Sequence, residues 1–364
     1  MWPDRRIIEL FKIEHPILLG PMASAVDFAL AVAVANAGGL GAIPCAMLTA
    51  EQLREQLGKF RAATRAPVNV NFFCHTPPVL NNAREVRWRE ELKPYYEELG
   101  IDSSTLVPSS NRAPFDETFC SVVEELSPEI VSFHFGLPPE PLYMRVKQAG
   151  CLVVSSATTV AEARWLEDQG VDAVIAQGFE AGGHRGMFLA DNLATQVGTF
   201  ALVPQVVDAV EVPVIAAGSV ADARGIVAAL ALGASGVQLG TAYLHCPESK
   251  ITPLHRAALP RNDATAVTNL YTGRPARGLV TRLMREVGPI SDVAPEFPLA
   301  GGALAPLRAK AEAHGSTDFS PLWSGEAAAL GRPLPAYELT RTFATEALAQ
   351  FARMGTRTAQ RVES

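Results

Sequence analysis

A glycine-rich segment with one histidine directly follows an apolar run of this chain. Residues 177–186 read QGFEAGGHRG, immediately after the apolar residues 173–176. Glycine lets a backbone approach a ligand closely, and histidine can accept or donate a proton near neutral pH. We therefore predict that His184 is catalytic, and the alternative is a glycine-rich turn with a solvated histidine. Its neighbour Arg185 is expected to face a carboxylate or solvent.

Two more glycine-bearing segments follow the last two apolar runs. Gly218 comes after residues 214–217, and Gly240 and Thr241 come after residues 236–239. Backbone N–H groups in such loops bind phosphate in many α/β barrels. The sequence thus predicts a phosphate site here, and the alternative is that each glycine forms only a tight turn.

Polar or polarizable residues end three of the earlier apolar runs. Met22 and Ala23 follow the first run, where they could line the flat face of a ring system. Asn71 lies among apolar neighbours in the third run, so its amide needs a partner: either a cofactor ring or a loop that it caps. His134 in the fourth run is either a second catalytic imidazole or a structural group with its own hydrogen bonds.

Short apolar runs alternate with amphipathic stretches along the chain. We predict strands at 17–19, 40–43, 68–73, 130–135, 152–154, 173–176, 214–217 and 236–239. We predict helices between them at 27–36, 50–61, 117–126, 141–149, 160–169, 202–209 and 221–232. This alternation indicates parallel strands joined by helical crossovers, and eight strands favour a (β/α)₈ TIM barrel over a doubly wound open sheet.

Two regions interrupt this alternation of strands and helices. Residues 75–114 are predicted to be a lid-like insertion after strand 3, with a helix around 84–99. The barrel core is assigned to residues 1–250, and 251–364 to a C-terminal extension packed on it. That extension is expected to consist of helices and loops: helices at 253–258 and 339–354, and an irregular stretch at 293–306.

The composition limits the classes of partner. The 364 residues carry a formal net charge of −7 and no basic run, which excludes a typical nucleic-acid-binding surface. Five widely spaced cysteines without a Cys-x-x-Cys pair predict no zinc site, no disulfide framework and a cytoplasmic location. Gly, Pro or charged residues interrupt the long apolar stretches, so no membrane span is expected.

Taken together, these motifs resemble the nitronate monooxygenase family, formerly called 2-nitropropane dioxygenases, and class I in particular. The resemblance covers residues 13–249. It implies a TIM barrel that binds FMN without a covalent bond. It also implies oxidation of alkyl nitronates by O₂ to a carbonyl compound and nitrite, which detoxifies them. We expect the protein to be a monomer or a homodimer. The motifs that carry it lie at 20–22, 36–41, 132–136, 180–186 and 240–249.

The resemblance also implies roles for single residues. His184 matches the active-site histidine, as either a base or an anchor for the substrate anion. His134 is a second candidate for a catalytic residue. The residues expected to bind FMN are Met22, Ala23, Asn71, Gln177, Gly182, Gly183, Gly218, Gln238, Gly240 and Thr241.

The chain departs from the class I pattern around the expected substrate pocket. Residues 106–112 contain no tyrosine, Phe297 stands where a tyrosine is expected, and no lysine follows until Lys310. Lost hydroxyls and positive charge would weaken binding of the doubly anionic propionate 3-nitronate, so a less polar nitronate is a second hypothesis. Two other functions stay open: an NAD(P)H-dependent FMN reductase acting on quinones or enoyl thioesters, and a non-catalytic flavin-binding protein.

Overall fold

Eight parallel strands form a barrel in the computed structural model, which describes residues 1–102, 112–261 and 264–362. Their order around the barrel is β1-β9-β8-β6-β5-β4-β3-β2, and a bridge between Leu18 and Leu40 brings β1 and β2 together. The predicted TIM barrel is confirmed, and the open sheet is wrong. The strands are β1 (Ile17–Leu19), β2 (Gly41–Pro44), β3 (Val68–Phe73), β4 (Ile130–His134), β5 (Leu152–Ala157), β6 (Ala173–Gln177), β8 (Val214–Ala217) and β9 (Gly236–Leu239).

Apolar side chains fill the barrel, because both faces of a parallel sheet are covered. The short helix α1 (Arg6–Phe11), which was not predicted, contributes Ile7 and Phe11 to this interior. Both are almost fully buried in one cluster with residues such as Ile130 and Ile215 from the strands. The amino-terminal segment therefore adds to the packing inside the barrel.

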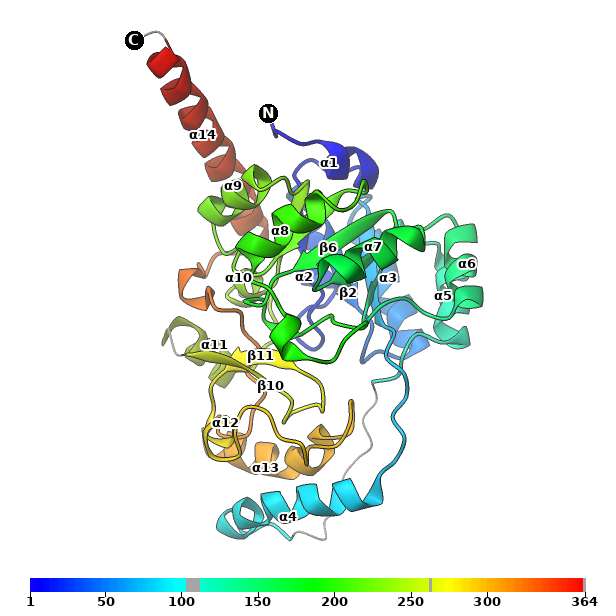
Figure 1. Cartoon of the computed structure of the whole chain (residues 1–364), viewed down its shortest axis with the longest axis vertical. Coiled ribbons are helices and arrows are strands. Elements are labelled where there is room, and N and C mark those ends of the chain that lie inside the picture. The colour runs from blue at the N-terminus through cyan, green and yellow to red at the C-terminus, as the bar shows by residue number, and fades with distance from the viewer. Residues whose placement is uncertain (103–111, 262–263, 363–364) are drawn as a thin grey trace.

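Helices surround the barrel at the predicted positions (Figure 1). Polar caps fix several of their starts; for example, Asp27 accepts hydrogen bonds from the first backbone N–H groups of α2. The long last helix, α14, packs against α2 and α9 and so completes the outer ring. The helices of the ring are α2 (Phe28–Asn36), α3 (Ala50–Ala63), α5 (Glu117–Leu126), α6 (Glu140–Gln148), α7 (Val160–Asp168), α8 (Thr199–Val207), α9 (Ala223–Ala231) and α14 (Ala336–Val362).

A second sheet of three short antiparallel strands was not predicted. It joins β7 (Gly183–His184), β10 (Thr265–Thr268) and β11 (Ala276–Leu279), in the order β10-β11-β7. His184 pairs with Ala276 in this sheet, so the histidine lies on a strand and not in the predicted glycine-rich loop. The expectation of only helices and loops after residue 250 is therefore wrong.

The insertion and the C-terminal extension pack on each other to form a small lobe, defined here as residues 82–98, 253–261 and 264–313. In Figure 1 it lies below the barrel. The Trp88 indole donates a hydrogen bond to the carbonyl of Ala300 at 3.0 Å. The lobe contains α4 (Asn82–Glu98), α11 (Pro253–Ala258), α12 (Arg282–Glu286) and α13 (Gly301–Ala313), so part of the predicted irregular stretch is helical.

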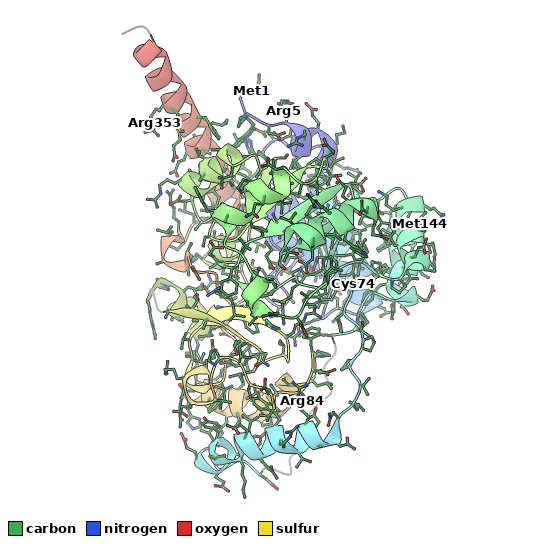
Figure 2. All side chains as sticks on the ribbon, in the orientation of Figure 1. Met1, Arg5, Cys74, Arg84, Met144 and Arg353 are labelled. Carbon is green, nitrogen blue, oxygen red and sulfur yellow. The ribbon has the colours of Figure 1, made fainter. Side chains whose placement is uncertain are left out.

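The chain passes from the barrel to the small lobe after β3. Figure 2 shows Cys74 at the edge of the barrel and Arg84 within the lobe. The part of the predicted insertion at 103–111 lies outside the described residues. Among the helices that the structure describes, none has the length and apolarity needed to cross a membrane.

Candidate active site

A cavity of about 340 Å³ lies at the carboxyl ends of the barrel strands. This is the face where TIM barrels carry their active sites. One side is lined by barrel loops and the other by residues 320–323 and by side chains of the small lobe. The structure brings all twelve predicted site residues to this cavity: Met22, Ala23, Asn71, His134, Gln177, Gly182, Gly183, His184, Gly218, Gln238, Gly240 and Thr241.

Hydrogen bonds fix the backbone of His184 from two directions. Its carbonyl oxygen accepts from Gln177 Nε2 at 2.9 Å and from His134 Nε2 at 3.1 Å. The other end of the same Gln177 amide, Oε1, accepts from the backbone N–H of Gly186 at 2.7 Å. With the pairing to β11, these contacts hold the position from which the imidazole projects.

Both ring nitrogens of His134 are engaged. Because a carbonyl oxygen only accepts, Nε2 must carry the proton that it donates to His184, and Nδ1 then accepts from the Ser156 hydroxyl at 3.0 Å. Burial lowers the pKa of His134 to about 4, so this ring is neutral at neutral pH. These bonds support the structural alternative for His134: it orients the segment that carries His184.

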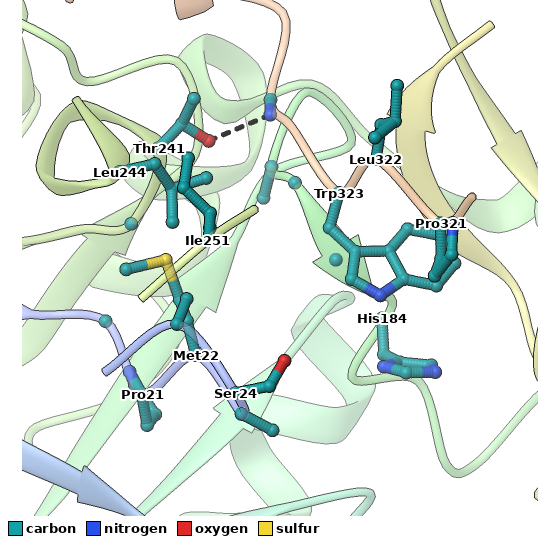
Figure 3. Close-up of a pocket in the computed structure, with 18 of the residues that line it drawn as sticks. Pro21, Met22, Ser24, His184, Thr241, Leu244, Ile251, Pro321, Leu322 and Trp323 are labelled. Carbon is teal, nitrogen blue, oxygen red and sulfur yellow. Dashed lines mark hydrogen bonds between the residues drawn. The ribbon is translucent and has the colours of Figure 1, made fainter. Parts of the chain in front are cut away.

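The imidazole of His184 lies among aromatic rings at the cavity wall. Figure 3 shows it beside Trp323, across the cavity from Met22 and Ser24. The centroid of its ring lies 5.3 Å from that of Phe297 and 5.6 Å from that of Trp323. Burial, and then the positive charge of Arg112, lower its pKa well below the usual value. His184 is therefore a neutral imidazole at neutral pH.

Two arginines bring positive charge to the cavity. Arg112 and Arg308 both line it, and Arg308 Nε donates to Glu312 at 2.8 Å. The lost lysine therefore does not leave the cavity without positive charge, because Arg112 lies at its wall, whereas the charge of Arg308 is balanced by Glu312, which also lines the cavity. A third arginine, Arg274, instead supports the wall: its guanidinium lies 4.0 Å from the Phe135 ring centroid.

Arg185 has a structural position that the sequence did not predict. Its side chain is fully buried and donates to the carbonyl oxygens of Gly178 at 2.7 Å and Gln177 at 2.8 Å. Its Nε donates to Gln196 Oε1 at 2.9 Å. The expectation that it faces a carboxylate or solvent is wrong. Instead it holds together the turn that follows β6.

Several features of the cavity fit a large ligand with hydrogen-bonding groups, such as FMN. The buried Oε1 of Gln238 has no hydrogen-bond partner, which is costly unless a ligand supplies a donor. Gly182, by contrast, is required by packing within the protein, because an added Cβ would lie 2.4 Å from the backbone nitrogen of Gly325. Gly218 has a φ of 122°, a conformation that favours glycine.

Two other residues that are predicted to bind FMN already form hydrogen bonds within the protein. Asn71 Nδ2 donates to the Ser132 hydroxyl at 2.9 Å, and the Thr241 hydroxyl accepts from Gly325 N at 2.9 Å. Asn71 thus has a partner on the neighbouring strand β4, whatever else it binds. Among the described residues, no group of three or more His, Cys, Asp or Glu side chains could hold a metal ion.

Sequence reasoning missed three residues around the imidazole. Thr272 Oγ1 lies 3.0 Å from His184 Nε2, Ser156 holds His134, and Trp323 lies beside His184. A single threonine, serine or tryptophan carries no motif, and each reaches the site only through the folded arrangement. Only the position of Ser156 near the end of a predicted strand could have indicated its role.

Comparison with known proteins agrees with this geometry. The sequence profile of nitronate monooxygenases matches residues 4–346. A nitronate monooxygenase of Pseudomonas aeruginosa is 42% identical over 94% of this chain and 98% of that protein. One of Paraburkholderia phytofirmans is 40% identical over 92% and 93%.

Solved structures of similar sequence share the fold of this chain. Nitroalkane oxidase from Streptomyces ansochromogenes superimposes with a TM-score of 0.87 at 34% identity, covering 96% of this chain and 99% of that one. FabK from Thermotoga maritima gives a TM-score of 0.70 at 28% identity, covering 97% and 98%. From the profile match and the relatives, we conclude that this chain belongs to the nitronate monooxygenase family.

Proposed function

We propose that this protein is an FMN-dependent enzyme that oxidises alkyl nitronates with O₂ to a carbonyl compound and nitrite. The net reaction balances when two nitronate ions and one O₂ give two carbonyl molecules and two nitrite ions. The observation that carries the proposal is a cavity at the strand ends that is lined by both the buried, unpartnered Gln238 oxygen and the neutral His184 imidazole. The oxygen suits a hydrogen-bond donor on a bound ring cofactor, and the imidazole can generate a nitronate from a nitroalkane by taking its α-proton.

The residues that would hold FMN fall into two groups. Met22, Ala23, Asn71, Gln177, Gly182, Gly183 and Gln238 would contact the ring and its edge. Gly218, Gly240 and Thr241 follow the seventh and eighth barrel strands, where TIM barrels commonly bind phosphate. Bound FMN would supply the electron transfer and the chemistry with O₂.

The electrostatics favour one of the two roles for His184. A neutral imidazole can take the α-proton of a nitroalkane, which is acidic because the nitro group delocalises the charge of the product. A cationic anchor would need the ring to be protonated, which its burial and the nearby arginines oppose. We therefore assign His184 as the base and Arg112 as the source of positive charge for an anionic substrate, because Arg308 is paired with Glu312.

The same charges bear on the substrate. The positive charge of Arg112 at the cavity wall compensates in part for the lost tyrosines and lysine, and it suits a nitronate with a second anionic group. Turnover of propionate 3-nitronate should therefore be at least as efficient as that of ethyl nitronate. A clear preference for nitronates with neutral chains would support the less polar substrate instead.

The physiological role that follows is nitronate detoxification in the cytoplasm. The five cysteines are free thiols, four of them buried, which suits a reducing compartment. Loss of nitronate tolerance in cells that lack the gene would support this role, and unchanged tolerance would contradict it.

The test of the proposed function uses the purified full-length protein. We expect the absorption spectrum of bound flavin, and nitrite after addition of ethyl nitronate in air. Two outcomes would contradict the proposal. Rapid bleaching of the flavin by NADH or NADPH under anaerobic conditions, without nitronate turnover, would indicate the FMN reductase. Bound flavin with neither activity would indicate a flavin-binding protein without catalysis.

A further inference from the structure

Thr272 contacts the imidazole of His184 from outside the barrel. It lies between β10 and β11 of the small lobe and is almost fully buried. Its hydroxyl oxygen is 3.0 Å from His184 Nε2 and 3.3 Å from the carbonyl oxygen of Arg274. The same hydroxyl therefore lies within hydrogen-bonding distance of a nitrogen that can donate or accept and of an oxygen that can only accept.

The single proton of this hydroxyl decides the direction of both bonds. A carbonyl oxygen accepts only, so both bonds form together only when the Thr272 hydroxyl donates to Arg274. Its oxygen then accepts a proton from His184 Nε2. A neutral imidazole carries one N–H, so Nδ1 of His184 holds the lone pair. Among the described residues none hydrogen-bonds to this Nδ1, and His184 lines the cavity.

We propose that Thr272 is a positioning residue that keeps His184 in the tautomer protonated on Nε2, which makes Nδ1 the atom that accepts the substrate proton. The role of Nδ1 rests on the proposed function, whereas the tautomer does not. The segment from Thr272 to β11 thereby holds His184 at two points, the ring and the backbone. Its threonine bonds the ring, and its strand β11 pairs with the backbone of β7.

The direct test is nitrogen NMR of the full-length, FMN-loaded protein with ¹⁵N-labelled histidine. The His184 signals are assigned by their loss in His184→Asn. We expect the wild type to show His184 protonated on Nε2. Thr272→Val, which has a similar shape but no hydroxyl, should lose this single tautomer, and Thr272→Ser should restore it. A wild-type ring protonated on Nδ1 would overturn the proposal, and so would an unchanged tautomer in Thr272→Val.

A kinetic comparison tests the consequence for Nδ1. A neutral nitroalkane must lose a proton, whereas a preformed nitronate has already lost it. Thr272→Val should lower kcat for nitroethane by about tenfold, a part of the roughly 10²–10⁴-fold that a general base contributes in full. Its kcat for ethyl nitronate, and its flavin content, should change little. An equal loss on both substrates would overturn the positioning role and indicate a structural one.

The two readouts separate this inference from the proposed function. If the wild type shows the predicted tautomer but forms no nitrite from either substrate, the proposed function fails and the hold of Thr272 on the ring stands. If nitrite forms but the tautomer is the opposite one, the proposed function stands and this inference fails.

Discussion

His134 donates the proton on its Nε2 to the backbone carbonyl of His184 at 3.1 Å. The two histidines that the sequence places at the ends of different strands are thus linked, with one ring holding the backbone of the other. This link gives His134 a positioning role beside a base, and it predicts how the protein responds to acid.

Acid should destabilise the protein partly through His134. Its pKa is about 4 in the folded chain against an ordinary value near 6.5, so the unfolded chain binds a proton that the folded chain refuses. The stabilisation is fully present above pH 6.5 and is lost as the pH falls toward 4, by roughly 1.4 kcal/mol per unit of pKa difference.

Chemical denaturation at pH 7.5 and pH 5.0 tests this. His134→Gln should lower the free energy of unfolding at pH 7.5 by about 1–3 kcal/mol, because buried partners lose their hydrogen bonds. It should also show a smaller difference between the two pH values than the wild type. The exposed His314→Gln is the matched control. An unaltered pH dependence in His134→Gln would contradict the assignment.

The pH profile of turnover distinguishes a neutral base from a cationic anchor. Since the pKa of His184 lies well below its ordinary value, the ring stays neutral through pH 6.5. We expect kcat/KM for nitroethane to stay constant as the pH falls from 8 to 6.5 and to drop only at lower pH. A cationic anchor would give the opposite trend, with activity declining as the pH rises above 6.5.

Gln238 should strengthen the binding of FMN and lower the stability of the apoprotein. Its buried Oε1 has no partner in the chain, so Gln238→Leu removes an unsatisfied acceptor whose burial costs about 1–3 kcal/mol. We expect the apoprotein to be at least as stable as the wild type and the Kd for FMN to rise about tenfold. Isothermal titration with FMN and thermal unfolding measure the two effects. The exposed Gln205→Leu should change neither, and unaltered FMN binding in Gln238→Leu would count against the assigned site.

Gly182 marks a close approach between the barrel and the segment before α14. A Cβ at this position would lie 2.4 Å from Gly325 N and 2.6 Å from the carbonyl carbon of Ser324. Gly182→Ala should therefore cost about 1–3 kcal/mol of stability, as overpacking does, and reduce the bound flavin. Gly58→Ala, on a helix with open space around the new methyl, should instead stabilise by about 0.5–1 kcal/mol. Equal stability of the two variants would contradict the packing described here.

The barrel was predictable because each of its strands is a short buried apolar run, and such a run is visible in consecutive residues of the sequence. The strands β7, β10 and β11 were missed because none of them is an apolar run: each has two to four residues, and polar residues or glycine take the place of apolar ones. Their pairing joins His184 to Ala276, which is distant in the sequence.

The difference between local patterns and long-range packing also explains which site residues could be predicted. Residues at strand ends, such as Gln177 and Gly218, are located by the barrel itself, and all of them reach the cavity. Thr272 and Arg308 belong to the small lobe, and their contacts depend on how that lobe docks. No local pattern encodes that docking, so neither residue was identified.

Nitrite formation by wild-type protein and His184→Asn, loaded with equal amounts of FMN, tests the role of His184 most directly. Both proteins are given nitroethane and, separately, ethyl nitronate in air. The variant should lose roughly 10²–10⁴-fold of the rate on nitroethane, the usual contribution of a general base, and keep most of the rate on ethyl nitronate. A variant that forms nitrite from nitroethane as fast as the wild type would contradict the account.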